Sequence, residues 1–295
     1  MKVAVVGDLF VVNEVLQTAF EKVFENSEPF NPDILAMALN PGLFGKHIIF
    51  RDTIGSTNVF LKKLAQEGAP EGTVVIADEQ SAGLGRLGRK WFSKKGENLL
   101  FSVLLRPSLP PSRLFVLTMI FALAGIDAVQ DISGLNAMIK WPNDIYIGEK
   151  KLGGILTEVA VINGVAQHLV LGMGLNVNWN PSAERTLLYP TSSIFAESLK
   201  KVSREVILVN LLKRLEVSYC ELGRDIKLAE GFYEKWNQKS LIFGKTVVIE
   251  TGKERIEGKA TSIDRDGALT LITVDGSERK FLCGDVSVKM NLSDQ

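Results

Sequence analysis

The pattern of apolar residues changes near Ser240, and this change constrains the fold more than any other feature of the chain. Before Ser240, strand-like runs alternate with helical segments, including a long apolar helix predicted over 112–131. After it, short strands with alternating apolar residues follow one another. The sequence therefore predicts an α+β protein, with a mixed body over 47–239 and a small antiparallel barrel over 240–295. The predicted barrel strands cover 245–250, 255–263, 269–274 and 279–282, with Asp-Gly turns at 266–267 and 275–276.

Residues 1–46 form a separate N-terminal segment whose role the sequence does not indicate. Apolar residues in 2–7 are typical of a strand, and those in 11–24 recur at helical spacing. A second short helix is predicted between turn signals at 31–33 and 40–42. Because every chemically suggestive motif follows this segment, we expect it to be dispensable for catalysis.

Charge and apolar content describe a globular chain without a general affinity for nucleic acid or lipid. Lys and Arg together number 34, as do Asp and Glu, so the net charge is zero and nothing draws the chain to phosphate backbones. The most apolar windows, such as 114–126, are shorter than the ~20 residues of a membrane span and predict a buried helix. Asp8 interrupts the N-terminal apolar run before any cleavage site, so we expect no secretion signal and a cytoplasmic location.

Cysteine and histidine are too few to build a metal or disulfide framework. Cys220 and Cys283 form no spacing motif, which excludes a Cys-rich zinc site and favours a reducing compartment. His47 and His168 lie far apart, and neither belongs to an HExxH or HxH pattern. We therefore expect each histidine to be a surface residue or a hydrogen-bonded core residue, and no His-ligated catalytic metal.

A glycine- and arginine-rich stretch, 83–91, directly follows a predicted strand. Gly83, Gly85 and Gly88 match the GxGxxG pattern of dinucleotide-binding proteins. That fingerprint, however, opens an apolar helix and is followed about 20 residues later by an acidic residue. Here a charged loop follows, and the residues around position 103 are apolar, so a dinucleotide site is not predicted. The chain also contains no GxxxxGK[ST] sequence, which excludes a P-loop.

The same stretch is suited to binding an anion. Glycines let backbone amides approach a ligand, and the planar guanidinium groups of Arg86 and Arg89 can each donate two hydrogen bonds to a carboxylate or phosphate. Trp91 could stack on a flat base. The alternative interpretation is a solvated basic turn.

Two further segments, 140–144 and 56–58, indicate a function only in combination with the other motifs. The segment 140–144 (KWPND) ends another predicted strand, where a lysine such as Lys140 is well placed to neutralise a phosphoryl or carboxylate group. Alone, Lys140 would more often be a surface lysine. Ser56-Thr57-Asn58 precedes a helix predicted over 59–68, and by itself it indicates only an N-cap.

Together these stretches resemble one family, the biotin protein ligases. They follow the order and spacing of that family over about residues 47–290, and in combination they are far more specific than any one of them. The matching segments are 56–58 (STN), 78–83 (DEQSAG), 85–91 (GRLGRKW), 140–144 (KWPND), 151–158 (KLGGILTE), 172–176 (GMGLN) and 284–287 (GDVS).

The resemblance implies both a fold and an activity. The fold is a mixed-sheet catalytic domain of the biotin/lipoate ligase type with a C-terminal SH3-like barrel. The activity is that of a ligase that uses ATP and Mg²⁺ to convert biotin into biotinyl-5′-AMP, then transfers biotin to a lysine of a biotin carboxyl carrier protein. The resemblance is compatible with a homodimer, and it identifies no metal ligands.

The resemblance also assigns roles to individual residues. Ser56, Thr57 and Gln80 would hydrogen-bond the ureido head of biotin, and Lys140 would bridge its carboxylate and the α-phosphate. Arg86 and Arg89 would hold the carboxylate and the phosphate, Trp91 would cover the adenine, and Asn176 would reach the nucleotide. The full biotin set is Ser56, Thr57, Gln80, Gly83, Leu84, Gly85 and Gly154; the ATP set is Arg86, Arg89, Trp91, Lys140, Asn143 and Asn176; and Lys140, Arg86 and Arg89 are the catalytic residues.

One position departs from the family's commonest pattern. That pattern reads Gly-Arg-Gly-Arg, and this chain has Leu84 in place of the first arginine. The backbone of Leu84 can still serve biotin, so we expect activity with one side-chain clamp over the adenylate missing.

Three alternative functions stay open. A lipoate or octanoate ligase shares the fold, but its signature lacks the Gly-Arg loop with Trp91. A biotin-sensing repressor would need an N-terminal winged helix-turn-helix; residues 1–46 are too short and carry three basic residues, so we do not expect DNA binding. A biotin-sensing module without catalysis is disfavoured by the presence of Lys140 and Arg86.

Overall fold

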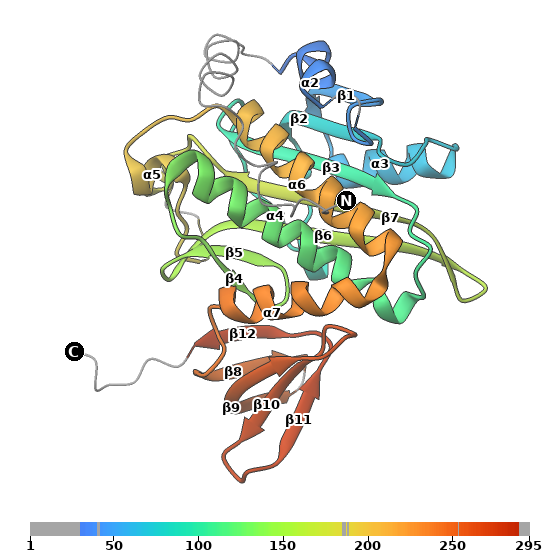
Figure 1. Cartoon of the computed structure of the whole chain (residues 1–295). Helices are drawn as coiled ribbons and strands as arrows, with labels where there is room; N and C mark the ends of the chain where they lie inside the picture. The colour runs from blue at the N-terminus through green and yellow to red at the C-terminus, as the bar shows by residue number, and fades with distance from the viewer. Residues whose placement is uncertain (1–29, 40–41, 185–186, 188, 253, 289–295) are drawn as a thin grey trace, which may run out of the picture.

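A mixed sheet of seven strands organises the main body of the computed structural model, which describes residues 30–39, 42–184, 187, 189–252 and 254–288 (Figure 1). The strand order is β1-β2-β3-β7-β6-β5-β4. Only the β1–β2 pair is parallel. The strands are β1 (Ile48–Ile54), β2 (Val74–Gln80), β3 (Asn98–Leu105), β4 (Met138–Lys140), β5 (Asp144–Ile147), β6 (Lys150–Ile162) and β7 (Val165–Asn176).

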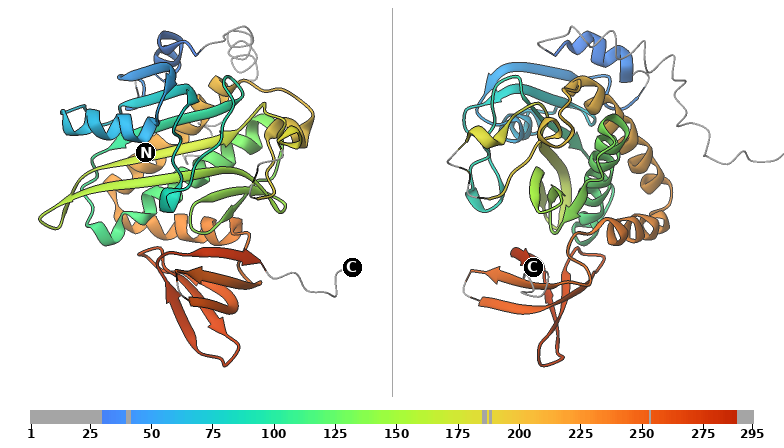
Figure 2. Two further views of the ribbon diagram at one scale, coloured as in Figure 1. Left: turned by 180° about the vertical axis from the view of Figure 1, so that it is seen from behind. Right: turned by 90° about the vertical axis from the view of Figure 1, so that its left-hand side faces the viewer.

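Helices cover both faces of this sheet. Helices α4 (Phe115–Ser133) and α6 (Arg204–Arg224) lie side by side against one face, as Figures 1 and 2 show. Helix α3 (Thr57–Gln66) covers part of the other face over a small separate core that includes Leu61 and Leu104. The shorter helices are α2 (Pro32–Leu39), α5 (Ile194–Ser198) and α7 (Ala229–Lys239), and 3-10 turns lie at Arg86–Gly88, Pro111–Arg113, Pro181–Ala183 and Ile226–Leu228.

Helix α4 is long, strongly apolar and deeply enclosed. With its preceding turn it spans Pro111–Ser133, which by length and composition could cross a membrane, so the expectation that every apolar stretch is too short was wrong. However, 78% of its most apolar window is buried inside the protein. Because the sheet, α6 and α7 surround it, α4 is apolar on all sides, as expected for a core helix.

Part of the N-terminal segment belongs to the main core. Helix α2 begins after Asn31, whose side chain accepts hydrogen bonds from the Asp33 and Ile34 amides. Phe30, Leu35 and Leu39 are buried in the same core as α4 and α6. This helix was predicted between two turn signals; the elements predicted over 2–7 and 11–24 lie outside the described residues.

The C-terminal region forms a separate antiparallel sheet of five strands, which confirms the predicted α+β architecture with a small second β domain. Its strand order is β11-β10-β9-β8-β12. Gly267 and Gly276 have φ values of 85° and 82°, which explains why the predicted Asp-Gly turns need glycine there. The indole Nε1 of Trp141 donates to the carbonyl of Gly267 (2.9 Å), linking this sheet to the main body. The strands are β8 (Thr246–Thr251), β9 (Glu254–Ile263), β10 (Leu269–Thr273), β11 (Glu278–Phe281) and β12 (Asp285–Val288).

Candidate active site

A cavity of about 600 Å³ opens where the ends of several strands and the C-terminal sheet meet. This volume is in the usual range for a small-molecule site. The lining includes Ser56, Thr57, Gln80, Leu84, Gly85, Arg86, Arg89, Trp91, Lys140, Asn143, Gly154 and Asn176, which are all of the predicted site residues except Gly83. The folded chain thus brings together segments that lie up to about 120 residues apart in the sequence. Local sequence patterns alone could not predict that these segments are neighbours.

One wall of the cavity is a compact set of hydrogen-bonded polar side chains at the start of α3. Gln80 Oε1 accepts hydrogen bonds from the Thr57 amide (2.8 Å) and hydroxyl (3.1 Å). Ser102 donates to Thr57 Oγ1 (2.8 Å) and lies 2.6 Å from Asn58 Oδ1. Ser56 occupies the predicted N-cap position, but its side chain makes no capping hydrogen bond, so its hydroxyl is left to face the cavity.

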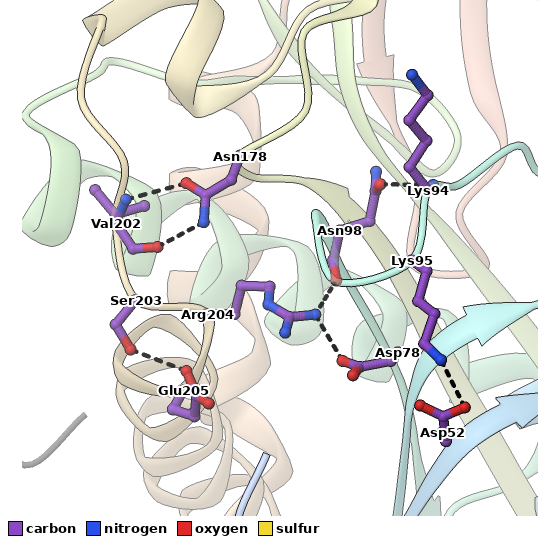
Figure 3. A network of polar contacts seen from close by, with 10 residues as sticks. All are labelled: Asp52, Asp78, Lys94, Lys95, Asn98, Asn178, Val202, Ser203, Arg204 and Glu205. Carbon is purple, nitrogen blue, oxygen red and sulfur yellow. Dashed lines mark hydrogen bonds and ion pairs between the residues drawn. The ribbon is translucent and has the colours of Figure 1, made fainter. Parts of the chain in front are cut away.

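A buried ion pair supports this wall from behind. Arg204, the first residue of α6, donates to Asp78 Oδ1 (2.9 Å) and to the carbonyl of Asn98 (3.1 Å), as Figure 3 shows. The Asn98 side chain donates in turn to Asn176 Oδ1 (2.8 Å), and the Asn176 amide donates to the carbonyl of Ser192 (2.9 Å). Asn176, which was predicted to contact the nucleotide, is therefore a buried side chain whose amide group already forms hydrogen bonds within the protein.

The 83–91 loop folds back on itself. The amide of Gly85 donates to the carbonyl of Arg89 (2.7 Å), and the amide of Trp91 donates to the carbonyl of Gly83 (2.9 Å). The bond from Gly85 corrects in part the expectation that the glycine amides are free for an anion, because this amide is already paired within the loop; anion binding therefore depends more on the arginine side chains. Gly83 packs closely against Trp91 at the other end of the loop, because a Cβ on Gly83 would come within 2.7 Å of the Trp91 carbonyl oxygen.

Trp91 lies flat on the cavity floor. A Cβ on Gly174 would come within 2.4 Å of the indole, and one on Gly154 within 3.2 Å, so the two glycines in β7 and β6 allow the ring to reach the sheet. The indole Nε1 is buried and makes no hydrogen bond within the described residues. The Lys151 ammonium lies 5.6 Å from the ring centroid.

Arg89 is paired with a residue of the C-terminal sheet. Its guanidinium makes an ion pair with Asp285, with one nitrogen–oxygen distance of 2.9 Å, and both side chains are about two-fifths exposed. The pair raises the pKa of Arg89 and lowers the pKa of Asp285. The C-terminal sheet thereby contributes directly to the cavity wall.

Two of the predicted cationic residues remain without a carboxylate partner among the described residues. Arg86 donates to the neutral side chain of Asn143 (3.2 Å). Lys140 forms no ion pair with any residue that the structure describes, and burial lowers its pKa. Lys151, by contrast, pairs with Asp144 at 2.7 Å. Arg86 and Lys140 are therefore the predicted residues that can meet an incoming anion without first breaking an ion pair.

Several cavity residues were not given a role from the sequence. Tyr146 and Tyr189 line the cavity but lie outside the segments quoted for the resemblance. Asn58, Asp144 and Asp285 lie within those segments, yet only the folded structure shows their partners. The described residues contain no group of three or more His, Cys, Asp or Glu side chains that could hold a metal ion.

Comparisons with known proteins agree with this geometry. The model of the biotin/lipoate A/B protein ligase family matches residues 50–176, and that of the biotin protein ligase C-terminal domain matches residues 242–289. The two matches cover the seven-stranded sheet through β7 and the five-stranded sheet.

Curated relatives and a solved structure extend the similarity to most of the chain. The bifunctional ligase/repressor BirA of Bacillus subtilis is 32% identical over 84% of this chain and 76% of its own length. The biotin–[acetyl-CoA-carboxylase] ligase of Mycobacterium tuberculosis is 32% identical over 79% of this chain and 85% of its own. The biotin protein ligase of Aquifex aeolicus, solved with biotin and ATP, superimposes with a TM-score of 0.70 at 29% identity, covering 83% of this chain and all of that one. This chain belongs to the biotin protein ligase family.

Proposed function

We propose that this protein joins biotin to ATP, forming biotinyl-5′-AMP, and then transfers biotin to a specific lysine of a biotin carboxyl carrier protein. The observation that carries the proposal is the division of one cavity into two chemically different walls. Neutral hydrogen-bonding groups at Ser56, Thr57 and Gln80 suit an uncharged cyclic urea, while Arg86 and Lys140 suit a carboxylate and a phosphate.

The first step must bring two anions together. The biotin carboxylate oxygen attacks the α-phosphorus, the bond to the bridging oxygen breaks, and diphosphate leaves. Lys140 and Arg86 offset the repulsion between carboxylate and phosphate, and they stabilise the charge that builds on the phosphoryl oxygens. Magnesium bound to the triphosphate would neutralise part of the charge on ATP.

The second step consumes the mixed anhydride. The neutral amine of the carrier lysine attacks the biotinyl carbonyl carbon, AMP leaves with the bonding electrons, and the amine loses a proton to give an amide. Water could attack the same carbon, so the intermediate needs cover. The 83–91 loop, which includes Trp91, lines the cavity and would provide this cover by closing over the bound intermediate, in the cytoplasm where the carrier is made.

The relatives favour biotin over lipoate. The first family model includes both kinds of ligase, but the match to the biotin protein ligase C-terminal domain is specific to one of them. The repressor role in the name of the Bacillus relative is not part of the proposal, because residues 1–46 carry three basic residues and the net charge is zero.

The test is a transfer assay with alternative acyl donors. The purified protein is incubated with Mg·ATP and either biotin with a biotin carboxyl carrier domain, or lipoate or octanoate with a lipoyl carrier domain, and the carrier mass is measured. A carrier domain with its acceptor lysine replaced by arginine is the control. We expect biotin to be added to the wild-type carrier alone; addition of lipoate or octanoate to its own carrier domain, with no biotin transfer, would refute the proposal.

A further inference from the structure

Tyr146 lies directly beside the ammonium group of Lys140. The Lys140 Nζ is 3.4 Å from the Tyr146 hydroxyl oxygen and 4.8 Å from the ring centroid. Tyr146 is 7% exposed, so the ring is fixed by its surroundings while its edge still reaches the cavity. An ammonium at this distance from a ring is attracted to the electron-rich face.

The β4–β5 hairpin dictates this contact. Met138 is paired with Tyr146, and Lys140 with Asp144, across the two antiparallel strands. Residues two apart in a strand point to the same face, so Lys140 and Tyr146 are diagonal neighbours on one face of the hairpin. Asp144, the direct neighbour of Lys140, forms its ion pair with Lys151 instead.

The contact matters because Lys140 sits in a poorly hydrated place. A lysine has a flexible four-carbon stem, and a compact ammonium group is strongly hydrated in water. In the cavity, water is partly replaced by the Tyr146 ring and hydroxyl. A lysine held in this way can meet the developing phosphoryl charge without first being ordered.

We infer that Tyr146 is a positioning residue for adenylation, holding the Lys140 ammonium over the place where carboxylate and α-phosphate meet. This inference rests on the proposed ligase function and adds a residue to it. Tyr146 acts through Lys140, so its removal should reduce the rate of adenylation far more than the affinity for biotin.

Other charged groups also face Lys140 and set the background for a pH test. Asp144 on β5 and Asp285 on β12 favour the charged lysine, whereas Lys151 on β6 disfavours it. Burial is the largest influence and lowers the pKa of Lys140. Replacing the Tyr146 ring with an aliphatic side chain removes a favourable partner of the ammonium, so the pKa of Lys140 should fall further. The alkaline limb of the adenylation rate should then move to lower pH.

The experiment compares Tyr146→Leu, which removes ring and hydroxyl, with Tyr146→Phe, which removes the hydroxyl alone. Single-turnover formation of biotinyl-5′-AMP is measured over a range of pH and biotin concentration. We expect Tyr146→Leu to slow adenylation by roughly three- to thirtyfold, the range of a cation–ring contact with a desolvated ammonium, with half-saturating biotin within twofold of wild type. Tyr146→Phe should lose threefold or less. Tyr219→Phe, which removes a hydroxyl bonded to Glu71 away from the cavity, is the matched control and should behave as wild type.

A double variant separates positioning from general structural damage. In a Lys140→Gln background, the further change Tyr146→Leu should cost less than twofold, because its target is already gone. An equal loss in both backgrounds, an unmoved alkaline limb, or a loss confined to biotin affinity would overturn the inference. If Tyr146→Leu does not fold, the same cycle and pH profile with Tyr146→Met, which also removes the ring, decide. Failure of the wild type to form biotinyl-5′-AMP would instead reject the ligase function itself.

Discussion

The two walls of the cavity are built in opposite ways. The wall at the start of α3 is built mostly from short side chains that are almost fully buried and hydrogen-bonded within the wall: Thr57 is 4% exposed and Asn58 3%, and the half-buried Gln80 accepts from Thr57. The opposite wall consists of long cationic side chains, of which Arg89 is 44% exposed and depends on a carboxylate from the C-terminal sheet. One wall is complete within the main body, and the other is assembled from two domains.

This difference suggests a division of labour. A preformed hydrogen-bonding wall recognises a neutral group with little reorganisation, which favours selective binding. Long cations that are partly exposed can rearrange as an anion enters, and they act where charge develops. Changes in the first wall should therefore alter biotin affinity, and changes in the second should alter rates.

The largest effect is expected for Lys140→Ala. Removing a group that stabilises developing phosphoryl charge typically lowers kcat by roughly 10²–10³-fold. Single-turnover adenylation measures the loss, and titration with biotin alone should show affinity close to wild type. Lys227→Ala, a substitution outside the cavity, is the control. An unchanged adenylation rate would remove Lys140 from the mechanism.

The next largest effect is expected for Gln80→Met, which breaks the buried wall. The variant leaves the Thr57 amide without its acceptor and removes a polar contact for the biotin head, each typically worth about 1–3 kcal/mol when buried. Half-saturating biotin should rise by roughly ten- to a hundredfold, while the maximal adenylation rate stays within a few-fold of wild type. Gln167→Met, at an exposed position on β7, should leave both unchanged. A lower maximal rate with unaltered half-saturation would contradict the role of this wall.

A smaller effect is expected for Leu84→Arg, which restores the family's usual residue. Leu84 is 40% exposed and lines the cavity, so the guanidinium of an arginine there would contact the adenylate while remaining partly hydrated. We expect biotinyl-5′-AMP to dissociate up to about tenfold more slowly from the variant than from the wild type. The dissociation rate of preformed intermediate is the measurement. Equal or faster release from the variant would show that Leu84 is a neutral replacement and that loop closure and Trp91 retain the intermediate.

The smallest effect is expected for Asp285→Asn, which breaks the ion pair between the two domains. Pairs this exposed are typically worth about 0.2–1 kcal/mol, so adenylation should change by less than about fivefold. Because Arg89 lowers the pKa of Asp285, the pair is complete above the ordinary aspartate pKa of about 3.9 and is lost only as the pH falls through the depressed value. The difference between variant and wild type should therefore be constant from neutral pH up to the start of the alkaline limb. Because Asp285 also favours the charged form of Lys140, that limb itself should move slightly to lower pH in the variant. A difference that changes on the neutral side of the limb would mean that another group titrates with the pair.

Sequence patterns sufficed for elements whose signals are local. The helix predicted over 59–68, the long apolar helix predicted over 112–131 and the Asp-Gly turns of the C-terminal sheet follow from apolar spacing and glycine. Strand β12 was not predicted as a strand, because four residues after Gly284 carry too short a pattern. Helix α4 extends to Ser133, two residues past the predicted end at 131, and it stops at Gly134, whose left-handed conformation (φ 72°) ends the helix.

Contacts between distant segments could not be predicted in this way. Arg89 and Asp285 are 196 residues apart, and nothing in either segment indicates the other. In the sequence Tyr146 is an ordinary strand residue, and only the pairing of β4 with β5 shows that it lies beside Lys140. Phe30 and Leu35 show that residues before 47 contribute to the main core. We therefore still expect residues 1–46 to be dispensable for the chemistry of adenylation, but we expect their removal to lower stability.

The most direct test of the division between the two walls is a single experiment on two variants. Single-turnover adenylation is measured as a function of biotin concentration for wild type, Lys140→Ala and Gln80→Met. We predict that Lys140→Ala lowers the maximal rate by roughly 10²-fold or more without shifting half-saturation, and that Gln80→Met shifts half-saturation by at least about tenfold without a comparable loss of maximal rate. If each variant changed both quantities to the same extent, the two walls would act as one unit and the account would be wrong.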